Sequence, residues 1–267
     1  MTKQISSFQN PTVKRLLQLQ EKSRSRKKEG VFIVEGKREI SLAIKAGFEI
    51  VELYFCAELF NTEQLSALLK NTAYQPEITE LSADVYNKIA YRGSTEGLIV
   101  VVKSKNTSLE NLQLDSKTPL ILVAEAPEKP GNIGALLRTA DAANLDAVLI
   151  ANPKTDLFNP NIIRSSVGCV FTNKIAAGTT SEIIQFLKNK NIAVYAAALQ
   201  ASKIYSAMDL TGPCAIVVGT EATGLSQDWL ENSDQNIIIP MQGEIDSMNV
   251  SVAAGILIFE AKRQRGF

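Results

Sequence analysis

Short apolar segments alternate with amphipathic ones along most of the chain, which predicts strands and helices in alternation. In the first hundred residues the predicted strands are 31–34, 50–55, a short one around Ile78, and 97–102. The predicted helices are 37–46, 62–69, 83–90 and an earlier one that opens at Asn10-Pro11. Asparagine can cap that first helix and proline can occupy its first position. This pattern is typical of a small α/β domain.

A second α/β series follows the polar stretch 103–117, which we interpret as a linker. The predicted strands are 120–124, 147–150, 170–175, 193–197, 215–219 and 237–240, and the predicted helices are 132–143, 161–166, 181–189 and 250–263. These strands are mostly apolar throughout, which favours a parallel sheet with helices on both faces. We therefore expect two domains, 1–102 and 118–267.

Composition and the apolar stretches favour a folded protein that does not enter a membrane. Hydrophobic residues make up 45% of the chain and charged residues 21%, as in a globular protein with a packed core. The first ten residues lack the apolar part of a secretory signal, and the longest apolar stretch, 250–259, is about half the length that spans a bilayer. We expect a cytoplasmic protein with no membrane partner.

Histidine is absent from the sequence, and this limits the chemistry that the protein can perform. Ser-His and Cys-His nucleophilic pairs are excluded, as are the common zinc sites that contain histidine. The three cysteines, Cys56, Cys169 and Cys214, are far apart in apolar surroundings, as buried structural cysteines are. We expect no metal site.

Positive charge is concentrated at the start of the chain although the formal net charge is zero. Residues 1–40 hold ten lysines and arginines against four acidic residues. Phosphate attraction depends on the local patch of charge, so this asymmetry predicts contact with a polyanion. The run that contains Arg24, Arg26, Lys27 and Lys28 is the centre of this patch. The alternative is a solvated basic helix end.

The first of three motifs in the second domain spans residues 125–140. A strand enters a glycine-containing loop that opens a helix, where backbone N–H groups are available to an anion. Asn132 and Arg138 are six residues apart on that helix, and we expect them to face the same side. A dinucleotide-binding loop fits poorly, because the next strand does not end in the acidic residue that would hold a ribose. Arg138 alone would more often be a surface cation.

The second motif, 216–226, is an apolar strand that ends in two glycines on either side of Glu221. Glycines there allow positive φ and a close approach of the backbone to a ligand. The third motif joins an apolar strand that stops at Pro240 to a helix that starts near Ser247 or Asn249. An ordinary turn would explain the second motif, and helix capping would explain the serine and asparagine of the third.

Together the three motifs resemble the signature of the SpoU/TrmH branch of the SPOUT RNA methyltransferases. The order is N-x-G-x-x-x-R, then G-x-E-x-x-G-L-S, then I-P-M followed by S-x-N-V-S-x-A. The resemblance covers the whole second domain, including 159–160, 164–168 and 196–199, and residues 29–36 resemble the substrate-binding domain often fused in front. Met248 stands where the family usually has leucine, which is a volume-conserving change.

The resemblance implies an α/β fold in which a C-terminal SPOUT domain, with a parallel sheet and a trefoil knot, follows a smaller ribosomal-protein-like RNA-binding domain. It also implies a homodimer with the active site near the subunit interface, and S-adenosylmethionine as cofactor in the knot loops. By similarity, the cofactor-binding residues are Leu199, Gly219, Thr220, Glu221, Gly224, Ile239, Met248 and Asn249.

The implied reaction is methyl transfer to a ribose 2′-hydroxyl of structured RNA, with ribosomal RNA favoured over transfer RNA. The expected catalytic residues are Arg138, Asn132, Asn249, Glu221 and Ser247. Arg138 would pair with an RNA phosphate and stabilise the developing alkoxide, because guanidinium holds its proton too tightly to be a good base. Asn132 and Asn249 would orient the arginine or the ribose, and Ser247 the loop. Glu221 would brace the pocket or meet Arg138 across the dimer or, as a weaker alternative, act as the base.

The expected RNA-binding residues are Arg24, Arg26, Lys27 and Lys28, with Arg164 the first candidate if the basic run is only solvated surface. Two other classes of protein stay open. A non-catalytic RNA-binding ribosome assembly factor would not need the intact set of polar motif residues. A nucleotide-dependent dehydrogenase would need the missing acidic residue.

Overall fold

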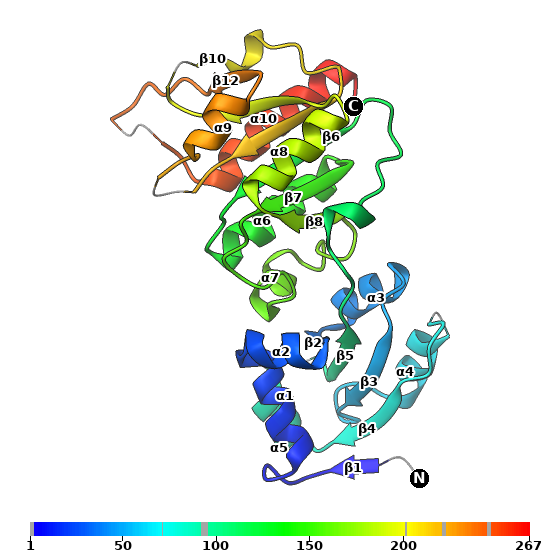
Figure 1. The fold of residues 1–267 in the computed structure, drawn as a ribbon. Helices are drawn as coiled ribbons and strands as arrows, with labels where there is room; N and C mark the ends of the chain where they lie inside the picture. The colour runs from blue at the N-terminus through cyan, green and yellow to red at the C-terminus, as the bar shows by residue number, and fades with distance from the viewer. Residues whose placement is uncertain (1–2, 71, 92–95, 201, 221–222, 245–246) are drawn as a thin grey trace. The chain divides into compact units, whose positions relative to one another are not determined.

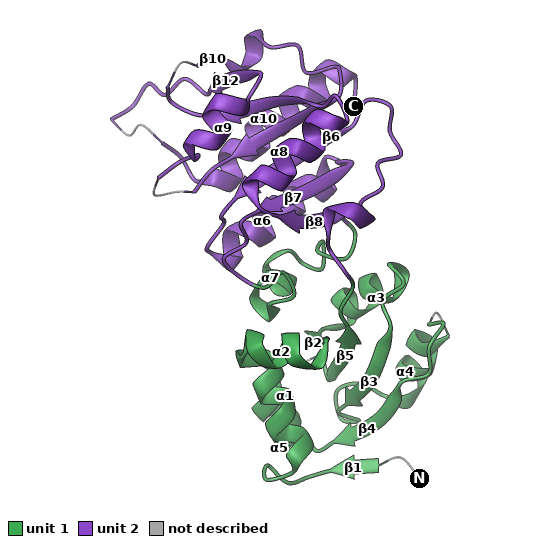
Figure 2. Ribbon diagram, in the orientation of Figure 1, with its two compact units in different colours: residues 1–105, 156–172 green, residues 106–155, 173–267 purple. Residues whose placement is uncertain are grey.

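Two β-sheets organise the part of the chain that the computed structural model describes, which is every residue except 1–2, 71, 92–95, 201, 221–222 and 245–246. One compact unit holds residues 1–105 and 156–172, and the other holds residues 106–155 and 173–267 (Figure 2). The segment 156–172 therefore packs with the N-terminal residues, although the chain has already formed two strands of the second sheet before reaching it.

The sheet of the first unit has five strands in the order β1-β4-β3-β5-β2 (Figure 1). The strands are β1 (Lys3–Ile5), β2 (Val31–Glu35), β3 (Ile50–Phe55), β4 (Glu77–Leu81) and β5 (Leu98–Lys103). Strands β1, β4 and β3 are parallel, whereas β5 is antiparallel to β3 and β2. The helices are α1 (Pro11–Glu21), α2 (Ser23–Glu29), α3 (Lys37–Lys45), α4 (Thr62–Leu69), α5 (Ala83–Ile89) and α7 (Pro160–Ser165).

The two faces of this sheet bury different kinds of side chain. Val31 and Ile33 of β2 belong to a largely aliphatic cluster that also contains residues of α1 and α5. Side chains alternate along a strand, so Phe32 faces the other side. There its ring stacks on Phe158, with centroids 4.3 Å apart, and Phe171 lies 6.1 Å away. Both of these rings come from 156–172, which explains why that segment belongs to this unit.

The basic run lies in helix α2, for which the sequence pattern gave no prediction. Residues 23–29 are helical, and Gly30 ends the helix with a left-handed φ of +66°. Arg26 is buried, with 4% of its surface exposed. Its Nε donates to Asp156 Oδ2 at 2.6 Å, and its Nη1 donates to the carbonyl oxygens of Leu19 at 2.7 Å and Gln20 at 3.0 Å. Arg26 therefore stabilises the unit and is not available to phosphates, whereas Arg24, Lys27 and Lys28 are exposed.

The sheet of the second unit has seven strands, all parallel, in the order β10-β12-β9-β11-β6-β7-β8 (Figure 1). The strands are β6 (Leu120–Glu125), β7 (Ala147–Ala151), β8 (Ile175–Gly178), β9 (Ala193–Ala197), β10 (Lys203–Ile204), β11 (Cys214–Val218) and β12 (Gln235–Ile238). The predicted parallel sheet is thus confirmed. Strand β8 starts later than expected, because residues 167–172 form turns instead.

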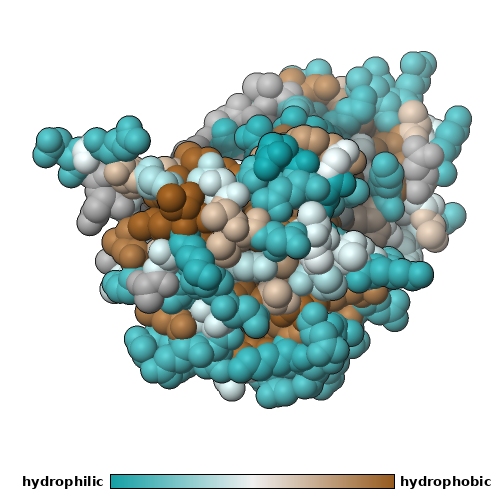
Figure 3. Space-filling model, turned by 90° about the horizontal axis from the view of Figure 1, so that it is seen from above, coloured by the Kyte–Doolittle hydropathy of each residue, from teal (hydrophilic) through white to brown (hydrophobic). Residues whose placement is uncertain are grey.

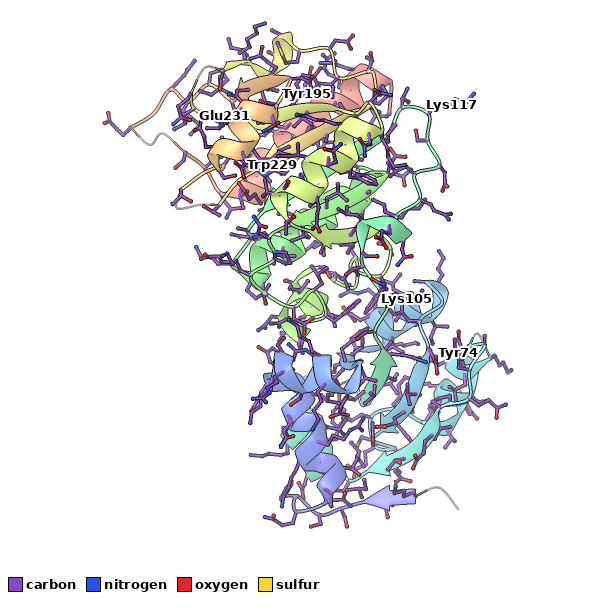
Figure 4. The ribbon with its side chains drawn as sticks, viewed as in Figure 1. Tyr74, Lys105, Lys117, Tyr195, Trp229 and Glu231 are labelled. Atoms are coloured by element: carbon purple, nitrogen blue, oxygen red, sulfur yellow. The ribbon has the colours of Figure 1, made fainter. Side chains whose placement is uncertain are left out.

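Helices cover both faces of this sheet, as the apolar strands predict. Helices α8 (Thr180–Asn189) and α9 (Gln227–Asn232) bury side chains with one face, and Trp229 of α9 is fully buried there (Figure 4). Helices α6 (Pro130–Ala142) and α10 (Val250–Arg265) pack against each other, and α10 contacts β11 and β6. In the part of the chain that the structure describes, no helix is both long and apolar enough to cross a bilayer.

The stretch 103–117, expected as a linker, is mostly bound to the second unit. Leu109, Leu112 and Leu114 pack on the cluster beneath α8, and Ser108 pairs with Ala177 beside β8. The isolated leucines of this polar stretch thus have a structural role. The domain boundaries 102/103 and 117/118 remain a prediction, and the compact units differ from them here and at 156–172.

The buried ion pair between Arg26 and Asp156 predicts unequal contributions from the basic residues of α2. Arg26→Ala should lower the free energy of unfolding by about 3–5 kcal/mol, because it leaves Asp156, whose side chain is 11% exposed, without its cation. Lys27→Ala and Lys28→Ala, at exposed positions of the same helix, should change it by less than about 0.5 kcal/mol. Urea denaturation followed by circular dichroism measures all three. Equal effects would contradict a structural role for Arg26.

Candidate functional site

A cavity of about 690 Å³ lies in the second unit, where β6 and β11 end. Its lining comes from the loop after β6, the start of α6, the loop after β11 and the first residue of α10. Ligands in open α/β sheets bind outside the carboxyl ends of the strands, so both position and size suit a small ligand. Parts of all three sequence motifs therefore meet at one pocket.

The motif-one loop turns sharply between β6 and α6. Ala126 has a φ of +44°, in the left-handed region that residues other than glycine seldom adopt. Its N–H donates to the carbonyl of Ala151 at the end of the neighbouring β7, which fixes the turn at 2.8 Å. Helix α6 begins at Pro130, two residues earlier than predicted, so Asn132 lies in its first turn and lines the pocket.

Asn132 and Asn249 join the first motif to the third. Asn249 Nδ2 donates to Asn132 Oδ1 at 3.2 Å. Asn249 is also the N-cap of α10, where its Oδ1 accepts a hydrogen bond from the Ser251 N–H at 3.0 Å. The capping interpretation of this asparagine is confirmed. The hydrogen bond from its Nδ2 to Asn132 places its amide beside the pocket, within reach of a substrate there.

Arg138 does not lie on the same side of α6 as Asn132, contrary to the sequence prediction. Six residues correspond to about 600° of helical rotation, so the two side chains point about 120° apart. Arg138 is exposed and does not line the pocket, and no described residue forms a hydrogen bond or ion pair with it. A guanidinium in that position is available to a group from outside this chain.

The motif-two loop is held closed by its own backbone. Thr220 N–H donates to Gly224 O at 3.0 Å, and Gly224 N–H donates to Thr220 O at 3.1 Å. A Cβ on Gly219 would collide with the Gly224 carbonyl group and would lie 2.6 Å from the Leu225 nitrogen. Gly219 must therefore be small because the chain approaches itself, whereas the sequence interpretation attributed this to a ligand. Gly224 has open space around it but a φ of +69°.

The remaining predicted site residues are distributed unevenly. Gly219, Thr220 and Gly224 line the pocket. Four others do not line the pocket. Leu199 is 56% exposed and Ser247 is also exposed, whereas Ile239 and Met248 are half-buried. Glu221 lies outside the described residues. Arg164 belongs to the first unit, where its guanidinium lies 5.8 Å from the centre of the Tyr91 ring.

Sequence reasoning gave no role to Glu125, which lies at the end of β6. Its side chain is buried and accepts hydrogen bonds from Ser226 of the motif-two loop, through N–H at 2.8 Å and Oγ at 2.7 Å. Lys154, from the loop after β7, also lines the pocket and lies outside the motifs. A carboxylate at the end of an otherwise apolar strand is the signal that could have indicated Glu125.

Comparison with known proteins agrees with this geometry. The model of the SpoU rRNA methylase family matches residues 119–259, and that of the MRM3-like substrate binding domain matches residues 10–100. The 23S rRNA (guanosine(2553)-2′-O)-methyltransferase RlmP of Bacillus subtilis is 29% identical over 260 residues, which are 97% of this chain and 99% of that protein.

Two solved structures match over nearly the whole chain. A crystal structure of an RNA 2′-O ribose methyltransferase is 38% identical, with a TM-score of 0.83 over 99% of this chain and 100% of that one. The AdoMet-bound rRNA methyltransferase from Sinorhizobium meliloti is 26% identical, with a TM-score of 0.90 over 98% of each chain. The fold and the pocket therefore define an S-adenosylmethionine-dependent RNA methyltransferase.

The chain belongs to the SpoU rRNA methylase family. The resemblance found in the three motifs is confirmed, as are the α/β fold, the class of enzyme and the cofactor. The residues present fit S-adenosylmethionine, because the cavity is large enough and is lined by the glycine loop and by the polar start of α6. The roles of individual residues, the knot and the domain boundaries stay predictions.

The closed motif-two loop predicts that Gly219 cannot carry even a methyl group. Gly219→Ala should weaken S-adenosylmethionine binding at least about tenfold, because the loop must open to relieve the clash with Gly224. Gly212→Ala, in the same unit and with no atom near the added Cβ, is the matched control and should bind normally. Titration calorimetry gives both affinities. Unchanged affinity in Gly219→Ala would show that the loop shape does not govern binding.

Proposed function

We propose that the protein methylates a ribose 2′-hydroxyl of ribosomal RNA in the cytoplasm, and that it acts as a homodimer. The observation that carries the proposal is the convergence of the motif-one loop, the motif-two loop and the start of α10 on one pocket. The named activity of the Bacillus subtilis relative, 23S rRNA guanosine 2′-O-methylation, supports ribosomal RNA as the substrate. Bound S-adenosylmethionine supplies an electrophilic methyl group.

The protein's own tasks are to orient the ribose and to stabilise the oxygen as it loses its proton to water. Asn132 and Asn249 are in contact at the pocket, so their amides can position a ribose hydroxyl together. Arg138 pairs with an RNA phosphate and stabilises the negative charge that develops on the 2′-oxygen. Ser247 and Glu221 support the same loops in this proposal.

The homodimer is supported by the surface of α10. Val252 is 53% exposed and Phe259 is 41% exposed, and two helical turns separate them, so they share one face. Apolar residues also reach the surface between hydrophilic ones on the side of the molecule drawn in Figure 3. A second copy would cover the α10 face. Since Arg138 does not line its own pocket, we infer that it serves the pocket of the other subunit.

Arg138→Ala should reduce methyl transfer by about 10²–10³-fold while S-adenosylmethionine affinity stays unchanged. Arg138→Lys should also be impaired, because a point charge does not replace a planar fork of donors. Lys188→Ala, at another exposed helical cation of the same unit, is the control and should keep full activity. Single-turnover methylation with a tritiated cofactor measures the rate. A rate within a few-fold of wild type would exclude the assignment.

Mixing Arg138→Ala with Gly219→Ala, at a cofactor concentration too low to fill the Gly219→Ala pocket, tests whether Arg138 acts across the dimer. Arg138→Ala provides an intact pocket, and Gly219→Ala provides an intact arginine. Random exchange of subunits should restore about a quarter of wild-type activity, because half of the dimers are mixed and each has one complete site. Mixtures as inactive as the separate variants would place Arg138 in its own subunit's site.

The exposed cations of α2 are the proposed RNA contacts of the first unit. Replacing Arg24, Lys27 and Lys28 together by alanine should make the slope of log affinity against log salt less negative by about 2.1–2.7, since three phosphate contacts are lost. Affinity for S-adenosylmethionine should not change. Filter binding at several salt concentrations measures the slope. An unchanged slope would mean that α2 is only solvated surface, and Arg164 would be the next residue to replace.

A further inference from the structure

Glu125 forms a hydrogen-bonded link between two elements that the sequence keeps far apart. Its side chain is 5% exposed. Oε1 accepts from Ser226 Oγ at 2.7 Å and from Thr180 Oγ1 at 2.9 Å, and Oε2 accepts from the Ser226 N–H at 2.8 Å. Each oxygen is therefore bound, and both bind Ser226. The carboxylate clamps the last residue of the motif-two loop by its backbone and its side chain at once.

The Ser226 side chain does not cap its own helix, because it is bound to Glu125. It occupies the N-cap position of α9, where a serine side chain usually accepts a hydrogen bond from the first turn of the helix. No such bond is formed, and its hydroxyl donates to Glu125 instead. Helix capping alone therefore does not explain the serine at this position.

The link fixes the far end of the loop that lines the pocket. The near end is fixed by β11, whose Val218 lies opposite Ala124 of β6, the residue before Glu125. Between these anchors, Thr220, Thr223, Gly224 and Leu225 line the pocket. No described cation forms an ion pair with Glu125, so hydrogen bonds are what offset the cost of burying its charge. Moving the loop would remove two of the three.

We propose that Glu125 is a positioning residue that holds the described part of the loop after β11, residues 219–220 and 223–226, in the shape that binds S-adenosylmethionine. The proposal rests on the proposed function, because the loop is assigned to the cofactor there. Glu125 lines the pocket, but both of its carboxylate oxygens are bound within the protein, and it acts through Ser226. It ties the start of motif one to the end of motif two through a single carboxylate.

Three substitutions separate positioning from general stability. Glu125→Gln keeps the size but presents an amide NH₂ where two donors now point, and Ser226→Ala removes one hydrogen bond on the loop side. Thr180→Val removes one hydrogen bond to the same carboxylate oxygen from α8, which does not line the pocket. Ser226→Ala and Thr180→Val each remove one hydroxyl from Oε1, and Thr180→Val also removes the hydrogen bond that Asn152 Nδ2 donates to Thr180 Oγ1 at 2.9 Å, so it is the more severe control.

The expected result is a separation of affinity from turnover. Glu125→Gln should raise the dissociation constant and KM for S-adenosylmethionine at least about tenfold, and Ser226→Ala about threefold or more, with kcat at saturating cofactor within about twofold of wild type. Thr180→Val should lower the melting temperature but leave the cofactor affinity near wild type. Glu125→Asp keeps the charge at a shorter reach and should lie between Glu125→Gln and wild type.

Calorimetry, steady-state kinetics and thermal unfolding provide these values, and the fluorescence of Trp229, the chain's one tryptophan, reports on α9 three residues after Ser226. Folded Ser226→Ala protein with wild-type cofactor affinity would overturn the proposal, even if Glu125→Gln does not fold. Equal losses of affinity in Ser226→Ala and Thr180→Val would also overturn it. Wild-type protein that binds the cofactor but leaves ribosomal RNA unmethylated would refute the proposed substrate without affecting this test.

Discussion

The pairing of β6 with β11 is the constraint on which the site depends. The two strands are parallel, buried along their whole length and in register from Cys214 opposite Leu120 to Val218 opposite Ala124. Parallel strands end at the same edge, so the loops that follow them emerge side by side. Each strand also has a second neighbour in the sheet, and neither can shift without breaking a further ladder of hydrogen bonds. The pocket is thus built on two central strands of the sheet of the second unit.

Regular periodicity was sufficient to predict most of the architecture, because the core is apolar and its pattern is local. Strands β6, β7, β9, β11 and β12 of the parallel sheet and the helices α1, α3, α4, α5, α8 and α10 lie close to their predicted positions. Helix α2 could not be predicted in this way, since Ser23–Glu29 has no apolar face. Strand β1 and strand β10 are too short to show an alternating pattern.

Within the site, the sequence indicated the pocket but not how it is held together. Asn132, Gly219, Thr220 and Gly224 are lining residues, as expected. Arg26 and Glu125 show why the rest was missed: each is a buried charge whose partner lies more than a hundred positions away along the chain. No local pattern distinguishes Arg26 from the solvated cations beside it, whereas Glu125 differs from a solvated charge only in that it ends an apolar strand. A basic run was therefore assigned to RNA as a whole, although one of its four cations is part of the packing.

The segment 156–172 also determines when the first unit can be completed during synthesis. Phe32 and Phe48 pack on Phe158 and Phe171, with ring centroids 4.3–6.1 Å apart. When residue 105 has just been added, Phe158 and Phe171 have not yet been synthesised. A further 67 residues must follow before residue 172 is made. At translation rates of about 5–20 residues per second, this interval lasts roughly 3–13 s. During that time Phe32 and Phe48 of the nascent chain lack the rings that cover them in the folded unit. The chain is then still on a ribosome, the particle whose RNA this family methylates.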